Sequence, residues 1–213
     1  MVIYFDLDGT LLDVKNRHYL YFMSFLRTCA LKNINISLIE YWNKKREMNS
    51  DINILEEYGG IFGKTNYDKK KISIIEEPFL LAEDKLFEFT NETLLIANNI
   101  AKVNLITHRT NNKNTIQQLK DLNIYHYFQQ IFLSDSLSKS KAKLLSEVVH
   151  NNKSERQILI GDTEIDFIAA KELGVECFLV ESGSRNRDYL LKICQSEIII
   201  FKNVYECINY LAT

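Results

Sequence analysis

The chain has 213 residues, of which 46% are hydrophobic, and its formal net charge is −2 with a pI near 6.1. This length and composition suffice for one full hydrophobic core, or for one core and a small second body. The near-neutral charge gives no reason to expect nucleic acid or an anionic membrane as a partner, and no apolar run approaches the ~20 residues of a membrane-spanning helix.

The cysteines are scattered along the chain and form no C-x-x-C pair, being Cys29, Cys177, Cys194 and Cys207. This spacing does not favour a zinc site. It is typical of reduced thiols in a cytoplasmic protein, which is the location we expect. A candidate site at Asp6 lies so near Met1 that a cleaved leader would remove the site itself.

The first strand predicted is Val2–Phe5, four apolar residues typical of a strand buried on both faces of a parallel sheet. It leads into Asp6-Leu7-Asp8-Gly9-Thr10. Residues i and i+2 of an extended segment point the same way, so we expect Asp6 and Asp8 to face one site at the carboxyl edge of the sheet. Two close carboxylates repel each other unless a cation or a shared proton lies between them.

From residue 14 to about residue 86 the pattern changes to helical spacing. Aromatic and aliphatic side chains recur in Tyr19–Leu26, Leu38–Trp42 and Ile52–Tyr58, and no stretch alternates as a half-buried strand would. The only proline, Pro78, marks a boundary near the end of this segment. We predict a helical body inserted between the first strand and the rest of the sheet.

After residue 87, short apolar runs alternate with helical segments. The expected strands are 103–106, 131–133, 158–160, 177–180 and 198–201, with Thr90 as the N-cap of one helix and Gly174 closing another. Strands separated by helices form βαβ units. The predicted fold class is α/β, a doubly wound parallel sheet with a Rossmann-like core made of residues 1–13 and 87–213, and a small α-helical cap domain made of residues 14–86.

Polar residues follow two of these later strands. Thr107 follows the strand at 103–106, where its hydroxyl and nearby backbone N–H groups could hold a phosphate oxygen. Asp162 follows the strand at 158–160, and Asp166 lies one helical turn further on. Each feature alone has an ordinary explanation as a helix cap or an acidic first turn. Gathered at one sheet edge, these hard oxygen ligands predict a Mg²⁺ site.

In their order along the chain, these segments resemble the motifs of the haloacid dehalogenase-like phosphohydrolase superfamily. The stretch from Asp6 to Thr10 resembles motif I, Thr107 matches motif II, and Gly161-Asp162-Thr163-Glu164-Ile165-Asp166 resembles motif IV. Motif III is a lysine at the start of the helix before motif IV. Lys139, Lys141 and Lys143 all compete for this role, and the apolar face of Leu144, Leu145 and Val148 favours Lys141, with Lys139 as the alternative.

The resemblance implies a role for each matching residue. Asp6 would be the nucleophile and Asp8 the general acid/base, with Thr107 and Lys141 anchoring the transferring group. Mg²⁺ would be held by Asp6, Asp162 and the backbone carbonyl of Asp8. The supporting residues would be Asp166, Gly9 and Thr10.

The insertion at 14–86 corresponds to the cap that follows motif I in the subfamily containing phosphoglycolate phosphatase and β-phosphoglucomutase. Arg17 and His18 are candidate substrate contacts within it. The chain departs from the subfamily in three places: His108 follows Thr107 where Asn is frequent, the usual Lys-Pro of motif III is absent, and Val14 stands where Ser is common. These departures leave the chemistry intact and the choice of substrate open.

We therefore expect a Mg²⁺-dependent phosphatase that hydrolyses a small phosphorylated metabolite through an aspartyl-phosphate intermediate. A phosphomutase is the alternative, because β-phosphoglucomutase carries a His in its cap where this chain has His18. A non-catalytic phosphate-binding regulatory module is less expected, because Asp6 and Asp8 are both present. Dehalogenation is disfavoured, because those relatives lack the second Asp. The substrate's identity and the oligomeric state do not follow from the sequence.

Overall fold

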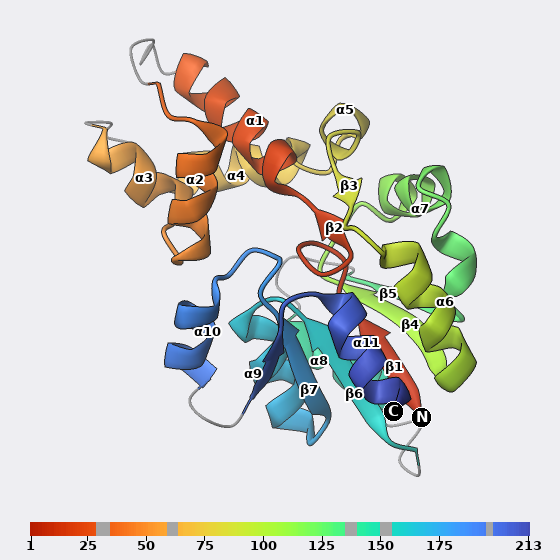
Figure 1. Ribbon diagram of the computed structural model, residues 1–213. Helices are drawn as coiled ribbons and strands as arrows, with labels where there is room; N and C mark the ends of the chain where they lie inside the picture. Colours follow the sequence, from red (N-terminus) through yellow and green to blue (C-terminus); the bar gives the residue numbers. More distant parts are fainter. Residues whose placement is uncertain (29–34, 59–63, 135–139, 150–154, 195–197) are drawn as a thin grey trace.

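The computed structural model describes residues 1–28, 35–58, 64–134, 140–149, 155–194 and 198–213. In this part of the chain the main sheet has six parallel strands in the order β5-β4-β1-β6-β7-β8 (Figure 1). They are β1 (Val2–Phe5), β4 (Lys102–Thr107), β5 (Gln130–Leu133), β6 (Gln157–Gly161), β7 (Glu176–Val180) and β8 (Ile199–Phe201). The predicted α/β class is confirmed.

Alternate residues of β1 point to opposite faces of the sheet, and helices cover both faces. Ile3 and Phe5 pack in one apolar cluster with α6 (Thr90–Ile100), α7 (Asn112–Asp121) and α11 (Val204–Ala212). Val2 and Tyr4 pack in another with α8 (Lys141–Val149) and α9 (Glu164–Leu173). The uninterrupted apolar run of β1 follows from this burial on both sides.

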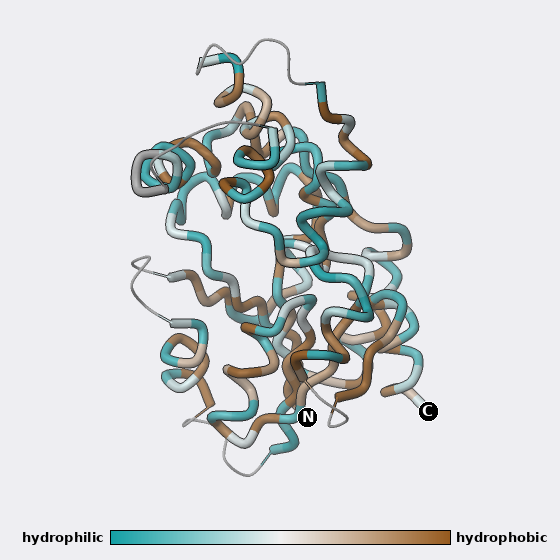
Figure 2. The backbone as a smooth tube through the Cα atoms, turned by 90° about the vertical axis from the view of Figure 1, so that its left-hand side faces the viewer, coloured by the Kyte–Doolittle hydropathy of each residue, from teal (hydrophilic) through white to brown (hydrophobic). Residues whose placement is uncertain are grey.

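A further helix, α10 (Arg187–Cys194), packs through Leu190 and Cys194 on the β7–β8 side of the sheet, and a 3₁₀ turn at Tyr125–Tyr127 follows α7. In Figure 2 the longest hydrophobic stretches of the backbone lie in the half of the molecule that contains both termini. Apolar burial is therefore concentrated around the sheet, which gives the strand ends a rigid base.

The segment between the first strand and α6 is helical, as its spacing predicts. It contains α1 (Lys15–Thr28), α2 (Leu38–Arg46), α3 (Asp51–Glu57), α4 (Lys64–Ile74) and α5 (Pro78–Leu81). These helices bury an apolar cluster of their own, which includes Phe22, Tyr41 and Leu55. Figure 1 shows them beyond the carboxyl ends of the sheet strands. The insertion therefore lies on the side where ligands bind in α/β proteins.

Two details differ from the sequence-based expectations. Leu12–Asp13 (β2) and Lys85–Leu86 (β3) form a small antiparallel sheet at the base of the insertion, where no strand was expected. A pair this short carries no alternation that a sequence could reveal. Thr90 is the first residue of α6 rather than its N-cap, because Phe89 takes the N-cap position with a φ of 64° and the Thr90 hydroxyl donates to the Leu11 carbonyl at 3.3 Å.

Among the described residues, Cys177, Cys194 and Cys207 are free thiols, whereas Cys29 lies outside them. None of the helices in the described ranges is both long enough and apolar enough to cross a membrane.

Candidate active site

Three neighbouring strands deliver polar residues to one edge of the sheet. Asp6 follows β1, Thr107 is the last residue of β4, and Asp162 follows β6. β1 pairs in parallel with both β4 and β6. Because adjacent strands lie about 4.8 Å apart and end at the same edge, these side chains come together although they are distant in sequence.

A cavity of about 350 Å³ opens at this edge, between the sheet and the helical insertion. Its walls include Asp6, Asp8, Thr107, Lys141 and Asp162, so the structure brings five of the predicted site residues to one space. The insertion contributes further side chains to the opposite wall, among them His18, Trp42 and Lys45. This arrangement is suited to a small polar ligand held between two bodies.

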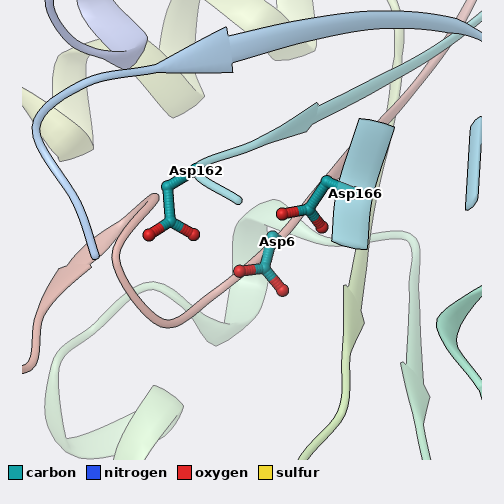
Figure 3. A group of neighbouring side chains, drawn as sticks. All are labelled: Asp6, Asp162 and Asp166. Carbon is teal, nitrogen blue, oxygen red and sulfur yellow. The ribbon is translucent and has the colours of Figure 1, made fainter. Parts of the chain in front are cut away.

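Asp6, Asp162 and Asp166 form an acidic cluster at the base of the cavity. Each is buried, and each offers a carboxylate oxygen within 4.8 Å of the others. Figure 3 shows Asp162 at the end of β6, Asp166 on α9 and Asp6 between them. The buried ammonium group of Lys141 forms ion pairs with both Asp6 and Asp166.

Lys141 is the first residue of α8, which is the helix-entrance position expected for the motif III lysine. Lys139, the alternative, lies outside the described residues. The choice between the two therefore stays a prediction, although Lys141 already lies where a cation would neutralise Asp6.

Glycines allow the backbone to approach Asp162 closely. A Cβ atom at Gly9, whose φ is +84°, would lie 2.1 Å from Asp162 Oδ2, and one at Gly183 would lie 2.3 Å from the same atom. The backbone N–H of Ser184 donates to this oxygen at 2.6 Å, and the Thr10 hydroxyl donates to Oδ1 at 3.5 Å. Gly9 and Thr10 thus shape the surroundings of Asp162, and their supporting role in the reaction stays a prediction.

Asp166 is held by its own helix. Its Oδ2 accepts hydrogen bonds from the Thr163 backbone N–H at 3.0 Å and from the Thr163 hydroxyl at 2.8 Å, while Oδ1 pairs with Lys141. This is a capping box at the start of α9. Protein groups engage both oxygens of Asp166, so this residue is placed to position Lys141. Asp6 and Asp162 are the members of the cluster better placed to bind a metal ion.

The acidic cluster carries more negative charge than one lysine neutralises. Burial, reinforced by the charge of Asp166, raises the pKa of Asp162 to about 7. Burial also raises the pKa of Asp6 well above its usual value, although Lys141 opposes the shift. Against the effect of burial, Asp166 and Asp6 raise the pKa of Lys141. A divalent cation between Asp6 and Asp162 would relieve this repulsion.

Asp8 faces a different set of partners, which we call the arginine cluster: Asp8, Asp84, Arg17 and Arg109. Arg17 contacts Asp8 Oδ2 at 2.8 Å. Arg109 donates from Nε to the same oxygen at 3.1 Å and from its terminal nitrogen to Oδ1. Arg17 and Arg109 also contact Asp84, each at 3.2 Å.

Asp6 and Asp8 therefore line one cavity, as expected, but their carboxylates pair with different basic side chains. The extended strand ends at Phe5 and the chain turns at Gly9, so the two carboxylates reach separate partners. Although burial opposes it, the guanidinium groups of Arg109 and Arg17 hold the pKa of Asp8 well below its usual range. Burial raises the pKa of Asp84 to about 6.

The two candidate substrate contacts of the insertion have different surroundings. Arg17 is 1% exposed and does not line the cavity, because its guanidinium is turned to Asp8 and Asp84. Its role as a substrate contact stays a prediction, and the structure places Arg17 in the arginine cluster. His18 does line the cavity, with its ring centroid 6.2 Å from that of Trp42.

Several residues of the site were missed in the sequence. Arg109 and Asp84 complete the arginine cluster, and Ser184 binds Asp162. Arg109 lies two positions after Thr107, and Ser184 lies in a small polar loop after β7. Their positions just after strands are a weak indication in the sequence that they belong to the site. Asp84 has none, because its partners come from distant segments.

Comparisons with known proteins agree with this geometry. A family model for haloacid dehalogenase-like hydrolases matches residues 3–180. A search of the curated proteins found no match.

Solved structures share the whole fold. A haloacid dehalogenase-like family hydrolase from Streptococcus pneumoniae is 21% identical, with a TM-score of 0.75 and coverage of 99% of this chain and 97% of that one. A predicted phosphatase from Clostridium acetobutylicum is 18% identical, with a TM-score of 0.72 and the same coverage. A predicted phosphoglycolate phosphatase from Haemophilus somnus is 20% identical, with a TM-score of 0.71, again covering 99% and 97%. With the family model matching most of its length, the chain belongs to the haloacid dehalogenase-like hydrolases.

Proposed function

We propose that this protein is a phosphatase that hydrolyses a small phosphate monoester through an aspartyl-phosphate on Asp6. The observation that carries the proposal is the position of Asp6 at the base of a cavity, next to the Lys141 ammonium and among further carboxylates. A carboxylate is a weak nucleophile toward an anionic phosphate unless positive charge offsets the repulsion between them. The site supplies that charge from Lys141 and has the ligands to hold more.

The residues present fit a Mg²⁺ ion. Asp6 and Asp162 offer hard carboxylate oxygens that are close together, and burial, reinforced by the neighbouring carboxylates, raises the pKa of each. We assign Asp6, Asp162 and the backbone carbonyl of Asp8 as the ligands, with Asp166 supporting them through Lys141. When bound, Mg²⁺ supplies positive charge that shields Asp6 from the phosphate dianion.

In the first step a carboxylate oxygen of Asp6 attacks phosphorus in line, and the bond between phosphorus and the ester oxygen breaks. Thr107 at the end of β4 and Lys141 at the start of α8 anchor the phosphoryl oxygens, since both line the cavity beside Asp6. Lys141 keeps its charge throughout, because Asp166 and Asp6 hold its pKa above the usual value. Dividing the reaction into two transfers lowers the barrier of each.

Asp8 is the general acid and base in this proposal. The arginines keep Asp8 ionised in the free site, and the negative charge of a phosphate ester bound in the cavity opposes them and favours protonation of Asp8. Asp8 then donates this proton to the departing ester oxygen, and takes a proton from the water that hydrolyses the aspartyl-phosphate. Its side chain keeps 30% of its surface exposed although its arginine partners are buried, and it lines the same cavity as Asp6. The two aspartates can therefore act on opposite ends of the breaking bond.

The helical insertion, which we assign to residues 14–86, would close the cavity and select the leaving group. Besides the arginine cluster, contacts of Glu76 and Arg46 join it to the sheet body. The Glu76 carboxylate accepts hydrogen bonds from the backbone N–H groups of Thr110 (3.1 Å) and Asn111 (2.6 Å). The backbone N–H of Asn186 donates to the Arg46 carbonyl at 3.1 Å. A closed cap excludes water from the phosphoenzyme. Location in the cytoplasm remains a prediction from the sequence.

A phosphomutase remains the second candidate, because His18 lines the cavity. Its Nδ1 is buried and has no hydrogen-bond partner within the described part of the chain. Burial, together with the charges of Lys71 and Arg17, lowers the pKa of His18 well below its usual value, so the ring is a neutral hydrogen-bonding group. A mutase would return phosphate to a second hydroxyl of the substrate instead of releasing it.

The decisive experiment is a screen of phosphorylated metabolites with the purified protein, with Mg²⁺ or with EDTA, in which released inorganic phosphate and isomerised sugar phosphate are both measured. We expect phosphate release that requires Mg²⁺. Isomerisation without net release would establish the mutase, and absence of both reactions with every substrate, p-nitrophenyl phosphate included, would refute the proposed function.

A further inference from the structure

Asp8 is held by two arginines that no motif of the chain identifies. We propose that Arg17 and Arg109 are positioning residues that fix the Asp8 carboxylate so that its Oδ1 atom faces the leaving group. The inference rests on the proposed function, in which Asp8 exchanges the proton. It assigns a specific task to a residue of the insertion and to a residue of the sheet body, neither of which contacts the phosphate in our proposal.

The hydrogen bonds to Asp8 distinguish its two oxygens. Oδ2 is contacted by Arg17 at 2.8 Å and by Arg109 Nε at 3.1 Å, whereas Oδ1 accepts only from the terminal nitrogen of Arg109. A carboxylate oxygen has two lone pairs. Oδ2 is therefore saturated by the two guanidinium groups, and Oδ1 keeps one lone pair for a proton.

Both arginines also contact side chains other than that of Asp8. Both contact the buried carboxylate of Asp84, Arg17 through Nε and Arg109 through its terminal nitrogen. Gln118 of α7 adds a second anchor, since its Oε1 accepts from Arg109 and its Nε2 donates to Asp84 at 2.9 Å. Arg109 is hydrogen-bonded to Asp84 and Gln118, whereas Arg17 meets Asp84 through an ion pair alone. A planar guanidinium group is preorganised and loses little freedom for each hydrogen bond it forms. Asp8 is thus oriented by a rigid frame.

If the arginine cluster served stability alone, its ion pairs would be explained, but the exposure of the Asp8 side chain would not. The side chains of Arg17, Arg109 and Asp84 are exposed by 2%, 3% and 0%, whereas that of Asp8 is exposed by 30%. Arg109 also borders the cavity, but Asp8 is the one member of the cluster whose side chain keeps substantial exposed surface there. Buried ion pairs are a poor source of net stability, so an arrangement that aims one carboxyl group into a reaction site points to positioning.

The proton transfers balance in both halves of the reaction. As Asp6 bonds to phosphorus, the ester P–O bond breaks and the proton on Asp8 Oδ1 moves to the departing oxygen, releasing the alcohol. A water molecule then attacks phosphorus, the Asp6–phosphorus bond breaks, and one proton of that water moves to Oδ1. Asp8 is protonated again and inorganic phosphate is released.

The test compares a leaving group that needs a proton with one that does not. We would measure kcat/KM of the parent and of Arg17→Met and Arg109→Met with β-glycerol phosphate and with p-nitrophenyl phosphate. Nitrophenolate leaves without a proton, and kcat/KM reports only the steps up to its release. We expect kcat/KM to fall at least about tenfold more with β-glycerol phosphate, since general acid catalysis contributes about 10²–10⁴-fold.

A burst gives a second, independent readout. Hydrolysis of the phosphoenzyme needs Asp8 as a base for every substrate, so the variants should release nitrophenolate in a rapid first turnover and then slow down. Arg156→Met is the matched control, because Arg156 pairs with Glu176 on the surface at 2.8 Å, at the start of β6 and away from the cavity. It should change neither readout by more than twofold.

Equal losses of kcat/KM with both substrates, without a burst, would overturn the inference while leaving the phosphatase intact. Failure of the parent to hydrolyse either ester would instead refute the proposed function. If a methionine variant fails to fold, Arg17→Lys keeps the charge but cannot reach Asp8 and Asp84 together. Its kcat/KM must then show the same selective loss for β-glycerol phosphate, and a loss equal for both esters would overturn the inference.

Discussion

The acidic cluster and the arginine cluster lie at the same cavity but differ in how many cations balance their carboxylates. In the acidic cluster of Asp6, Asp162 and Asp166, Lys141 pairs with Asp6 and Asp166, and within the described part of the chain it is the one cation paired with these aspartates. In the arginine cluster two carboxylates are matched by two guanidinium groups. The first retains an excess of negative charge and the second does not.

The pKa values record this difference. Burial and neighbouring carboxylates raise the pKa of Asp162 to about 7 and that of Asp6 as well, whereas the arginines hold that of Asp8 well below its usual range against the effect of burial. Two aspartates separated by one residue are thus given opposite electrostatic surroundings. The acidic cluster therefore keeps negative charge that a bound cation could offset, while the carboxylates of the arginine cluster are balanced by the protein's own guanidinium groups.

The largest expected effect is at the nucleophile. Asp6→Asn removes the attacking oxygen and its charge but not its volume, so the fold should persist. Phosphate release should fall below about a hundredth of the parent rate, because removing such a group costs several orders of magnitude. Steady-state assays with Mg²⁺, together with a circular dichroism spectrum, would check this. Activity above that level in the folded variant would contradict the nucleophile assignment.

Removing one cationic side chain from each cluster should show whether Mg²⁺ can replace it. Lys141→Met removes the ion-pair partner of Asp6 and Asp166, which we expect to cost about 3–5 kcal/mol of the free energy of unfolding. Arg17→Met leaves Asp8 and Asp84 with Arg109 alone, so we expect a smaller loss. Added Mg²⁺ should restore much of the loss in Lys141→Met, because the ion binds the folded acidic cluster. It should restore none in Arg17→Met.

Urea unfolding with and without Mg²⁺ measures this difference. Arg156→Met serves again as the surface control, with an expected loss below about 1 kcal/mol. Equal recovery of Lys141→Met and Arg17→Met would show that the two clusters do not differ in their need for a cation.

A smaller effect concerns pH. The folded pKa of Asp162 is raised to about 7 from an ordinary value of 3.8. Its contribution to stability is therefore present below pH 3.8 and is lost as pH rises through about 7, because the native state keeps the proton that the unfolded state releases.

Without metal, the melting temperature of the parent should fall relative to that of Asp162→Asn between pH 4 and 7. We expect a difference of a few degrees, since 1 kcal/mol corresponds to about 2–4 °C in a chain of this size. Differential scanning calorimetry in EDTA at several pH values would measure it. Parallel pH profiles of the two proteins would contradict the raised pKa.

The smallest effect is expected at the wall of the insertion. His18→Ala removes a neutral ring from the cavity without disturbing either cluster. It should raise KM for the best metabolite roughly tenfold or less, because one neutral hydrogen bond contributes about 0.5–1.5 kcal/mol. Turnover of p-nitrophenyl phosphate should stay close to that of the parent. An equal loss of turnover with both substrates would place His18 in the chemistry and favour the mutase.

Much of the fold could be read from local patterns. The apolar run of β1, buried on both faces, predicts a parallel strand, and the left-handed Gly174 ends α9 as expected. The pair β2–β3 could not be predicted, because Leu12 and Leu86 meet only where the chain returns after α1–α5. The position of Thr90 differs from the prediction for a related reason. Capping is a local preference, whereas the Thr90 hydroxyl bonds to the carbonyl of Leu11, which is distant in sequence.

The sequence by itself determined which carboxylates reach the edge of the sheet, because Asp6 and Asp162 directly follow buried strands and parallel strands end together. Only the tertiary structure decided which cations meet them. Arg17 and His18 are neighbours in sequence, yet they project about 100° apart around α1, so one is buried against Asp8 and the other faces the cavity. Ion pairing depends on distances of a few ångströms between segments far apart in the chain, and spacing along the chain carries no record of those distances.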